Sequence, residues 1–434
     1  MKRAAAFEVK GWCPGALKPM QSGDGLMVRV RPRCGMFTPN ELIVLAAAAA
    51  RFGNGHIDLT RRANLQIRGA SEETLPGLHD AIGRLGLLDP SAEAEAVRNL
   101  MMSPLAGIDP TEVLDVSEIA RELARLLASE RALWGLPSKF GFIIDGGGIL
   151  TLAFERADIR LAAIRDGTEL AVAIGLDTQA GIDWLGSVSP RNAAIAAIET
   201  ALAFLEVTPN GTRQRIRDLF AEGLASLRSA MRSRLDPLTL VPPKAGAPSH
   251  RRVGLLDLGF GRFAVGIAAP FGRVESDQLE KLGGEMAALV VQEVRLSPWR
   301  ILYAEVGSAS VGQAILDVAR SVDLITDRRD PLLGIEACPG APACRSTSLD
   351  TRGDARRLAA LASRFGFAGS IHVSGCAKGC AKSALADLVL VGADGEYGIV
   401  RNGTAQDRPA STASFAELVA NPGAAFASVE GRRP

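Results

Sequence analysis

The sequence predicts an α+β fold in which two similar half-units are each followed by a larger α/β domain. Three observations lead to this prediction. A strand–helix–strand pattern near the N-terminus returns 237 residues later, a longer run of helices and strands follows each copy, and four of the six cysteines gather near the C-terminus. The predicted domains are residues 1–75, 88–240, 251–307 and 308–434.

Composition and charge exclude several classes of partner. The chain has 434 residues, of which 47% are hydrophobic and 22% charged, and its net charge is +1. These values fit an ordinary folded protein and predict no overall attraction to nucleic acid or to a membrane. No apolar run has the length of a membrane span, the N-terminal residues contain no apolar run of signal-peptide length, and most of the few cysteines are clustered. We therefore expect a cytoplasmic protein, with no nucleic-acid and no membrane partner.

The first half-unit reads as strand, helix and strand. Residues 26–32 alternate in polarity as a strand does, directly after a Gly-Asp-Gly turn. Thr38 is placed to cap a helix that ends at Gly53. Residues 57–68 alternate again and are predicted to form the second strand.

The same order returns in the second half of the chain. Residues 263–272 match residues 26–35 with an offset of 237, and by the second strand the offset becomes 238, so that Arg62 meets Arg300. Two unrelated units of similar type would be the simpler explanation, but the order, the spacing and the turn residues agree. A repeat at this distance predicts two halves related by a pseudo-twofold axis.

One face of the first half-unit is rich in arginine. Alternation places a set of polar residues together on that side of the two strands. They are Arg29, Arg31 and Arg33 on the first strand and Asp58, Thr60, Arg62, Asn64, Gln66 and Arg68 on the second. A solvated face is the ordinary explanation for one such strand, but two strands with five arginines and no lysine favour a bound polyanion, because guanidinium binds carboxylates in a bidentate manner. RNA is disfavoured because the chain is only 5% aromatic and these faces offer no ring for stacking.

The two larger domains share a predicted order of elements. In the first, a helix at residues 116–127 precedes a strand at 140–144, a glycine turn and a hairpin partner at 149–154. In the second, a helix, a strand, a glycine- and cysteine-containing turn and a hairpin follow in the same order. The last domain is therefore interpreted as a second copy of the first, with Lys139 near the place where the second cysteine pair begins.

The four clustered cysteines have the spacing of a four-thiolate iron–sulfur site. They are Cys338 and Cys344, with five residues between them, and Cys376 and Cys380, with three residues between them. A [4Fe–4S] cluster needs four converging thiolates, and close pairs on glycine-rich loops supply them. Two disulfides or a structural zinc are the alternatives; a reducing compartment disfavours the first, and the usual two-residue spacing of zinc pairs disfavours the second. Cys13 and Cys34 stand alone; thiolate ligands and reactive thiols are the alternatives, but isolated cysteines of this kind are interpreted mainly as packing residues.

At these residues the chain resembles the sulfite/nitrite reductase superfamily. The likeness is carried by the two cysteine pairs and by the pattern Leu59, Thr60, Arg62 and Gln66. It implies two ferredoxin-like half-repeats and two larger domains that hold sirohaem beside a [4Fe–4S] cluster. It also implies anion-binding or catalytic roles for Arg31, Arg98 and Lys139. Gly141 stands where that family has a second lysine, which disfavours sulfite or nitrite as the substrate because that chemistry needs several cations and proton donors.

Within this superfamily the chain resembles the precorrin-3B synthases of aerobic cobalamin biosynthesis. The likeness is carried by residues 11–20, 22–31, 338–346 and 374–381. It implies a monooxygenase that uses O2 and reducing equivalents to hydroxylate precorrin-3A at C-20 with formation of a γ-lactone. A [4Fe–4S] cluster and a mononuclear non-haem iron are implied as cofactors. The four histidines show no spacing typical of iron ligands.

The residue chemistry agrees with that resemblance. A precorrin carries a rim of acetate and propionate groups, which an arginine-rich face can bind. The expected tetrapyrrole-binding residues are Arg29, Thr60, Arg62, Asn64, Gln66 and Arg68. No glycine fingerprint opens a helix, so electrons are expected from an external reductase or ferredoxin. The alternatives are a sirohaem-dependent sulfite or nitrite reductase and an electron-transfer protein without its own catalysis.

Overall fold

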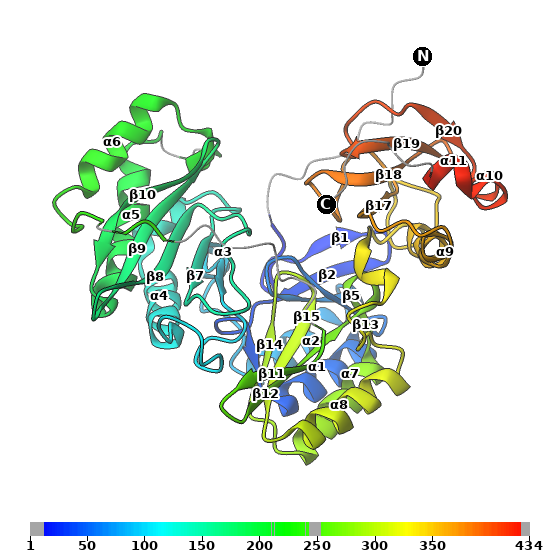
Figure 1. The fold of residues 1–434 in the computed structure, drawn as a ribbon, viewed down its shortest axis with the longest axis horizontal. Helices are drawn as coiled ribbons and strands as arrows, with labels where there is room; N and C mark the ends of the chain where they lie inside the picture. Colours follow the sequence, from blue (N-terminus) through cyan, green and yellow to red (C-terminus); the bar gives the residue numbers. More distant parts are fainter. Residues whose placement is uncertain (1–12, 210, 212, 239, 243–252, 427–434) are drawn as a thin grey trace. The chain divides into compact units, whose positions relative to one another are not determined.

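The computed structural model describes residues 13–209, 211, 213–238, 240–242 and 253–426 (Figure 1). These residues form two compact units. The smaller unit contains residues 21–26 and 327–426, and the larger unit contains residues 13–20 and 27–326. Among the described helices, none combines the length and the apolar character that a membrane crossing requires.

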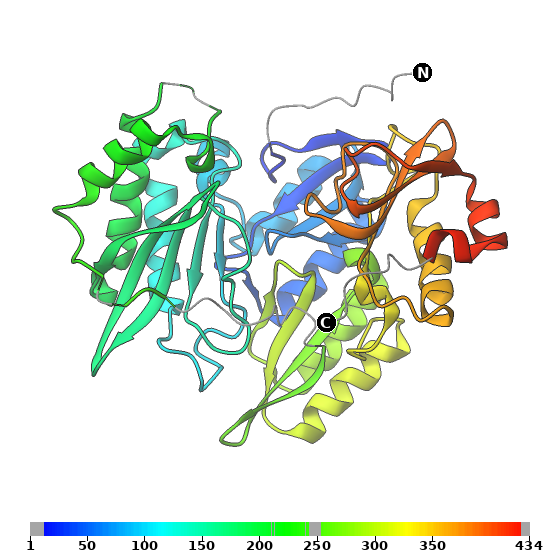
Figure 2. The ribbon, with the colours of Figure 1, turned by 45° about the horizontal axis from the view of Figure 1, so that its top comes forward.

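The half-repeats, drawn as ribbons in Figures 1 and 2, form two five-stranded sheets with matching strand orders. The orders are β1-β2-β5-β4-β13 and β11-β12-β15-β14-β3. The strands are β1 (Met20–Ser22), β2 (Gly25–Val30), β3 (Met36–Phe37), β4 (His56–Leu59), β5 (Leu65–Ala70), β11 (Gly254–Gly259), β12 (Arg262–Ala268), β13 (Arg273–Glu275), β14 (Val294–Leu296) and β15 (Ile301–Val306). Each sheet thus takes its last strand from the other half of the repeat.

This exchange of strands is reciprocal. β3 pairs with β14 through Phe37 and Val294, and β13 pairs with β4 through Val274 and Ile57. Phe37 and Val274 are 237 positions apart, and so are Ile57 and Val294. The two contacts are therefore the same contact made twice, as a pseudo-twofold axis requires, and the predicted relation between the halves is confirmed.

The second predicted strand, residues 57–68, is a hairpin. β4 and β5 pair in antiparallel fashion. In the turn between them, the Thr60 hydroxyl accepts hydrogen bonds from the backbone N–H groups of Arg62 (3.3 Å) and Asn64 (3.2 Å), and Ala63 has a φ of +51°. The prediction of one strand is wrong because the reversal keeps alternate residues on one face, so the polarity pattern continues across the turn.

The same turn corrects the alignment of the two halves. The turn residue with positive φ in the second copy is Arg300, at +63°, which lies 237 positions after Ala63. The offset therefore stays at 237, and the counterpart of Arg62 is Trp299 and not Arg300. An alignment by residue identity alone pairs Arg62 with Arg300, because it does not include the turn geometry.

Helices cover the half-repeat sheets. They are α1 (Pro39–Phe52), α2 (Leu75–Arg84), α7 (Ser276–Ala288) and α8 (Ala309–Ser321). The predicted cap is confirmed: the Thr38 hydroxyl accepts from the backbone N–H of Glu41, and the Glu41 carboxylate accepts from that of Thr38. α1 and α7, which are equivalent in the repeat, pack against each other. Gly283 permits the close approach, since a β-carbon there would lie 3.0 Å from the Ile43 side chain.

The middle domain contains one five-stranded sheet in the order β10-β9-β8-β7-β6. Its strands are β6 (Leu100–Met102), β7 (Phe142–Asp145), β8 (Ile159–Asp166), β9 (Glu169–Thr178) and β10 (Gly181–Val188). Its helices are α3 (Ala92–Val97), α4 (Ser117–Ser129), α5 (Ala193–Glu206) and α6 (Ala221–Met231), with short 3-10 turns at Arg131–Gly135, Pro190–Asn192 and Ile216–Asp218. β6, β7 and β8 run parallel, and residues 149–154 form no strand, so the predicted hairpin there is wrong.

The C-terminal domain repeats this plan in the order β16-β17-β18-β19-β20. Its strands are β16 (Ile335–Ala337), β17 (Ile371–Ser374), β18 (Ala386–Ala393), β19 (Glu396–Gly403) and β20 (Ser411–Ala413). Its helices are α9 (Thr351–Arg364), α10 (Phe415–Ala420) and α11 (Pro422–Phe426), with a 3-10 turn at Pro331–Gly334. A further 3-10 turn, Pro270–Gly272, precedes β13 in the second half-repeat. β16, β17 and β18 are parallel, and β19 and β20 return antiparallel.

The shared plan corrects the position given to Lys139. Cys376 follows β17, whose counterpart in the middle domain is β7. The segment after β7 begins at Gly146, whereas Lys139 precedes that strand. The second cysteine pair therefore corresponds to the glycine turn of the middle domain. The four predicted domain boundaries stay predictions.

Candidate functional site

Three predicted arginines lie close together in the larger unit. Arg29 is on β2, Arg31 follows its last residue, and Arg62 is in the turn between β4 and β5. Burial lowers the pKa of all three, and the neighbouring Arg29 lowers the pKa of Arg31 and Arg62 further. The pKa of Arg31 falls to about 10. These three residues are called the arginine cluster below.

The hydrogen bonds of the Arg31 guanidinium go to uncharged acceptors, and the nearby Glu95 carboxylate partly offsets its charge. Its guanidinium donates to the backbone oxygen of Glu95 at 2.6 Å, to Oδ1 of Asn99 at 2.8 Å and, at 3.5 Å, to the backbone oxygen of Pro14. Within the described part of the chain, the buried Nε atoms of Arg29 and Arg31 have no hydrogen-bond partner. A buried cation with unused donors is costly unless an anion binds there. The cluster therefore has the properties of an anion-binding site.

Arg98 contacts the backbone that carries Arg31 of this cluster. Its guanidinium binds the Asp89 carboxylate at 2.9 and 2.7 Å and donates to the backbone oxygens of Pro32 and Arg31 at 3.2 and 3.0 Å. Only 4% of Arg98 is exposed. Its charge is therefore compensated by Asp89, and the contacts hold the backbone that carries Arg31.

The remaining predicted residues on this face have different surroundings. Thr60 and Asn64 form the turn that presents Arg62, and Gln66 is half-buried. Arg68 is buried, with its Nη1 3.2 Å from Sδ of Met27. Lys139 is exposed, and its backbone oxygen accepts a hydrogen bond from Arg62 at 3.3 Å. The contact between Arg62 and Lys139 therefore involves the backbone oxygen of Lys139 and not its ammonium group.

Sequence reasoning missed two members of this site. Cys13, interpreted mainly as a packing residue, lies beside the Arg29 side chain and raises the pKa of that guanidinium, against the effect of burial. Glu95 is buried next to the cluster and receives backbone N–H groups from the segment that carries Cys13. No sequence pattern marks Glu95. Cys34, in contrast, lies in the apolar core of the middle domain, where burial raises its pKa to about 11, as a packing role predicts.

The first thiols of the two cysteine pairs follow neighbouring parallel strands. Cys338 comes directly after β16, and Cys376 comes two residues after β17. The backbone N–H of Cys338 donates to Val373 at 3.1 Å, and that of Gly375 donates to Sγ of Cys338 at 3.1 Å. Because the carboxyl ends of adjacent parallel strands meet at one edge of a sheet, the two pairs are brought together.

The surroundings of the second cysteine pair raise the pKa of both of its thiols. Burial raises the pKa of Cys376, and the thiols of Cys338 and Cys344 raise it further. Burial also raises the pKa of Cys380 to about 11; Lys378 opposes this, and the three other thiols add to it. All four cysteines are free thiols. The donor set fits a four-thiolate cluster, and Gly340 and Gly379, with φ of +65° and +61°, allow the tight loops around it.

A mononuclear metal site has different requirements from a four-thiolate cluster. Among the described residues, no group of three or more His, Cys, Asp or Glu side chains is arranged to hold one metal ion. In a cubane each thiolate binds a different iron, so its four sulfurs lie farther apart than the ligands of a single ion. His372 is fully buried on β17.

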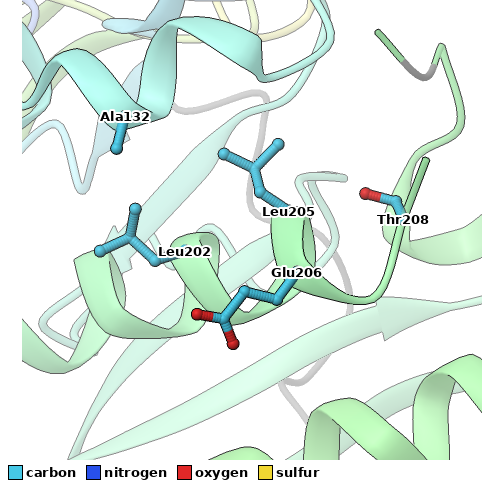
Figure 3. Close-up of a pocket in the computed structure, with 5 residues that line it drawn as sticks. All are labelled: Ala132, Leu202, Leu205, Glu206 and Thr208. Carbon is cyan, nitrogen blue, oxygen red and sulfur yellow. The ribbon is translucent and has the colours of Figure 1, made fainter. Parts of the chain in front are cut away.

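The middle domain also has an open hollow of about 520 Å³, shown in Figure 3. Its lining residues are Ala132, Leu202, Leu205, Glu206 and Thr208. None of them belongs to the predicted site or to the arginine cluster. We assign no function to this hollow.

Comparison with known proteins identifies the family. A precorrin-3B synthase from Sinorhizobium sp is 34% identical over 93% of this chain and 85% of its own length. The chain belongs to the precorrin-3B synthase family. Residues 18–85 match the nitrite/sulfite reductase ferredoxin-like half domain, in agreement with the predicted first half-repeat.

More distant relatives are reductases. A ferredoxin–nitrite reductase from Leptolyngbya laminosa is 26% identical over 88% of this chain and 79% of its own length. A ferredoxin-dependent sulfite reductase from Mycobacterium tuberculosis is 25% identical over 84% of this chain and 69% of its own length. The structure of Mycobacterium tuberculosis NirA superposes with a TM-score of 0.76 at 20% identity, covering 94% of this chain and 82% of that one. The predicted α+β, sulfite/nitrite reductase-like fold is confirmed.

Proposed function

We propose that this oxidoreductase is a monooxygenase that hydroxylates precorrin-3A at C-20, with γ-lactone formation, to give precorrin-3B. Membership of the family supports the reaction. The observation in the structure that carries the proposal is the arginine cluster, where buried guanidinium groups have Nε donors without a partner among the described residues.

The arginine cluster suits the rim of such a substrate. A precorrin presents several carboxylates at the edge of a broad ring, and each can accept two hydrogen bonds from one guanidinium. Arg29 and Arg62 are half-buried and would bind carboxylates directly, whereas Arg31 is almost fully buried and would supply charge from behind them. In a site with little water these interactions are stronger than at an open surface. Arg98 would act on the substrate through Arg31, and a direct role for the Lys139 ammonium stays a prediction.

The four thiols would hold a [4Fe–4S] cluster, which supplies electrons one at a time when bound. Gly375 would donate its N–H to the Cys338 sulfur, a contact that tunes such a centre. The electrons would come from a separate reductase or ferredoxin. Cys380→Ser tests this assignment: we expect iron and acid-labile sulfide to fall, and full contents of both would exclude Cys380 as a ligand.

Reduction of sulfite or nitrite with bound sirohaem is the second candidate, because relatives with those names share the fold. Gly141 argues against it. In this chain the Gly141 backbone N–H donates to the Asp158 carboxylate at 2.9 Å, and no ammonium group can extend from that position. A site with one lysine offers fewer proton donors to a small anion.

The deciding experiment uses protein purified without oxygen. The proposed function predicts no extractable sirohaem, binding of precorrin-3A, and formation of the hydroxylated lactone after O2 and a reductant are added. Extracted sirohaem together with turnover of sulfite or nitrite would establish the second candidate. A bound cluster without any tetrapyrrole binding would leave electron transfer alone as the function.

A further inference from the structure

Glu95 lies at the junction of the segments that carry the arginine cluster. It is on α3, and only 4% of it is exposed. Its carboxylate accepts hydrogen bonds from the backbone N–H groups of Ala16 at 2.6 Å and Leu17 at 3.1 Å. Its backbone oxygen accepts one from Arg31 at 2.6 Å. Glu95 therefore holds the segment that follows Cys13 with its side chain and an arginine of the cluster with its main chain.

The segment at residues 13–18 fits closely against this carboxylate. A β-carbon on Gly15 would lie 2.2 Å from Oε2 of Glu95, so a larger residue there would displace the carboxylate. The backbone oxygen of Gly15 accepts a hydrogen bond from the backbone N–H of Arg29 at 3.1 Å. The same segment places the Cys13 thiol beside the Arg29 side chain. Main-chain and side-chain contacts thus connect Glu95 to two arginines of the cluster.

We propose that Glu95 is a positioning residue for tetrapyrrole binding, which sets the directions in which Arg29 and Arg31 face a substrate carboxylate. The inference rests on the proposed function, because it takes the arginine cluster as the substrate site. The carboxylate has two opposing effects on an anion. Its negative charge repels the anion, but its two buried, charge-assisted hydrogen bonds keep the guanidinium donors in place before binding. We expect the preorganisation of the guanidinium groups to outweigh the repulsion of the anion, because both oxygens of the Glu95 carboxylate already accept hydrogen bonds from backbone N–H groups.

Glu95→Gln separates the two effects because they have opposite signs. Glutamine has the same size but lacks the charge, and it offers one acceptor oxygen to two donors. Uroporphyrin, a stable tetrapyrrole with acetate and propionate groups, serves as the probe in equilibrium binding. We expect its affinity to fall roughly tenfold, the equivalent of one charged hydrogen bond. Unchanged or tighter binding would overturn the proposal, since a residue acting only by its charge would give that result.

Glu93→Gln is the matched control. It makes the same change on an exposed residue of the same helix, and we expect wild-type affinity. A loss equal to that of Glu95→Gln would mean that α3 acts only through its overall charge, which also overturns the proposal.

Gly15→Ala disturbs the same contact without altering any charge. We expect it to weaken uroporphyrin binding by a similar factor and to increase the rate at which iodoacetamide alkylates Cys13, because the segment leaves its place. Glu95→Gln should increase that rate as well, and Glu93→Gln should not. If either variant fails to fold, Glu95→Asp keeps the charge with a shorter arm and should show intermediate affinity and alkylation rate.

The two readouts distinguish failure of this inference from failure of the proposed function. Absence of uroporphyrin and precorrin-3A binding by the wild-type protein would reject the proposed function. Normal wild-type binding with unchanged affinity and Cys13 alkylation in Gly15→Ala would reject only the positioning role.

Discussion

The middle and C-terminal domains share one sheet plan but carry different chemistry at the same edge. Ser103 follows β6 in the middle domain, and Cys338 follows the equivalent β16 in the C-terminal domain. In both domains a glycine after the next parallel strand donates its N–H to this side chain, from Gly146 to Ser103 at 3.0 Å and from Gly375 to Cys338 at 3.1 Å. A hydroxyl and a thiol thus occupy equivalent positions.

The surroundings of these two positions explain the difference in chemistry. In the middle domain, carboxylates fill the edge and accept backbone N–H groups of the loops: Asp109 from Ile149, Glu112 from Gly107, and Asp145 from Leu152. In the C-terminal domain the corresponding loops carry thiols, which are weak hydrogen-bond acceptors. Carboxylates therefore satisfy the backbone N–H groups of the first edge, whereas the proposed function assigns the thiols of the second edge to an iron–sulfur cluster. The comparison teaches that function here lies in side chains placed on a shared scaffold.

The largest expected effect comes from making the two edges alike. Cys338→Ser gives the C-terminal domain the residue of the middle domain, and we expect most iron and acid-labile sulfide to be lost, since a hydroxyl is a poor substitute for a thiolate ligand. Iron and sulfide assays after anaerobic purification measure this. The reverse change, Ser103→Cys, should add neither iron nor sulfide because its edge lacks the three other thiols. Retention of both in Cys338→Ser would break the comparison.

The next effect tests whether the arginine cluster binds the tetrapyrrole independently of the thiols, which are proposed to bind iron. Arg62→Ala should lower tetrapyrrole affinity about tenfold through loss of one bidentate contact. Its iron content should stay at the wild-type level, because Arg62 lies in the larger unit and the four thiols in the smaller one. Arg61→Ala, a change at the exposed neighbouring arginine, is the matched control. Equal losses in both variants would show that general positive charge suffices.

A smaller effect tests a polar contact that distinguishes the two cores. Tyr397 is fully buried on β19 and donates to the Asp354 carboxylate on α9 at 2.8 Å, whereas its counterpart on β9 is the apolar Val172. Tyr397→Phe should lower the free energy of unfolding by about 1–2 kcal/mol, because it leaves a half-buried carboxylate without that donor. Chemical denaturation measures the change. In the Asp354→Asn background the same substitution should cost less, and equal costs would show that the hydrogen bond contributes little.

The smallest effect is a pH dependence of the middle domain. Burial raises the pKa of Glu112 to about 7, with the Gly107 N–H opposing and Asp115 and Asp109 adding to the shift. An unfolded glutamate titrates near pH ~4.3, so between that pH and about 7 the folded state binds more protons than the unfolded state. The free energy of unfolding should therefore fall as pH rises through this window. Glu112→Gln should flatten that slope, while Glu169→Gln, at an exposed position, should leave it; an unchanged slope in Glu112→Gln would contradict the prediction.

Local patterns predicted much of the fold because they depend on neighbours in the chain. The Thr38 cap and the helix that became α4 follow from short-range preferences, and the repeat was found because the same local pattern occurs twice in the chain. The hairpin at Thr60 was not predicted, because polar and apolar residues alternate with the same period in both of its strands and through the turn that joins them. Exchange of β3 and β13 between the halves was also missed, since strands of two or three residues carry almost no pattern.

The sequence by itself determined the repeat, the cysteine spacing and the excess of arginine, and these were enough to indicate an iron–sulfur oxidoreductase of this superfamily. Only the tertiary structure decided which arginines have unused donors. Arg98 is compensated by Asp89, whereas Arg31 meets mainly neutral oxygens, and Glu95 links that arginine to the segment of Cys13. The reason is physical: burial and hydrogen-bond partners come from residues distant in the chain, and no local pattern records them.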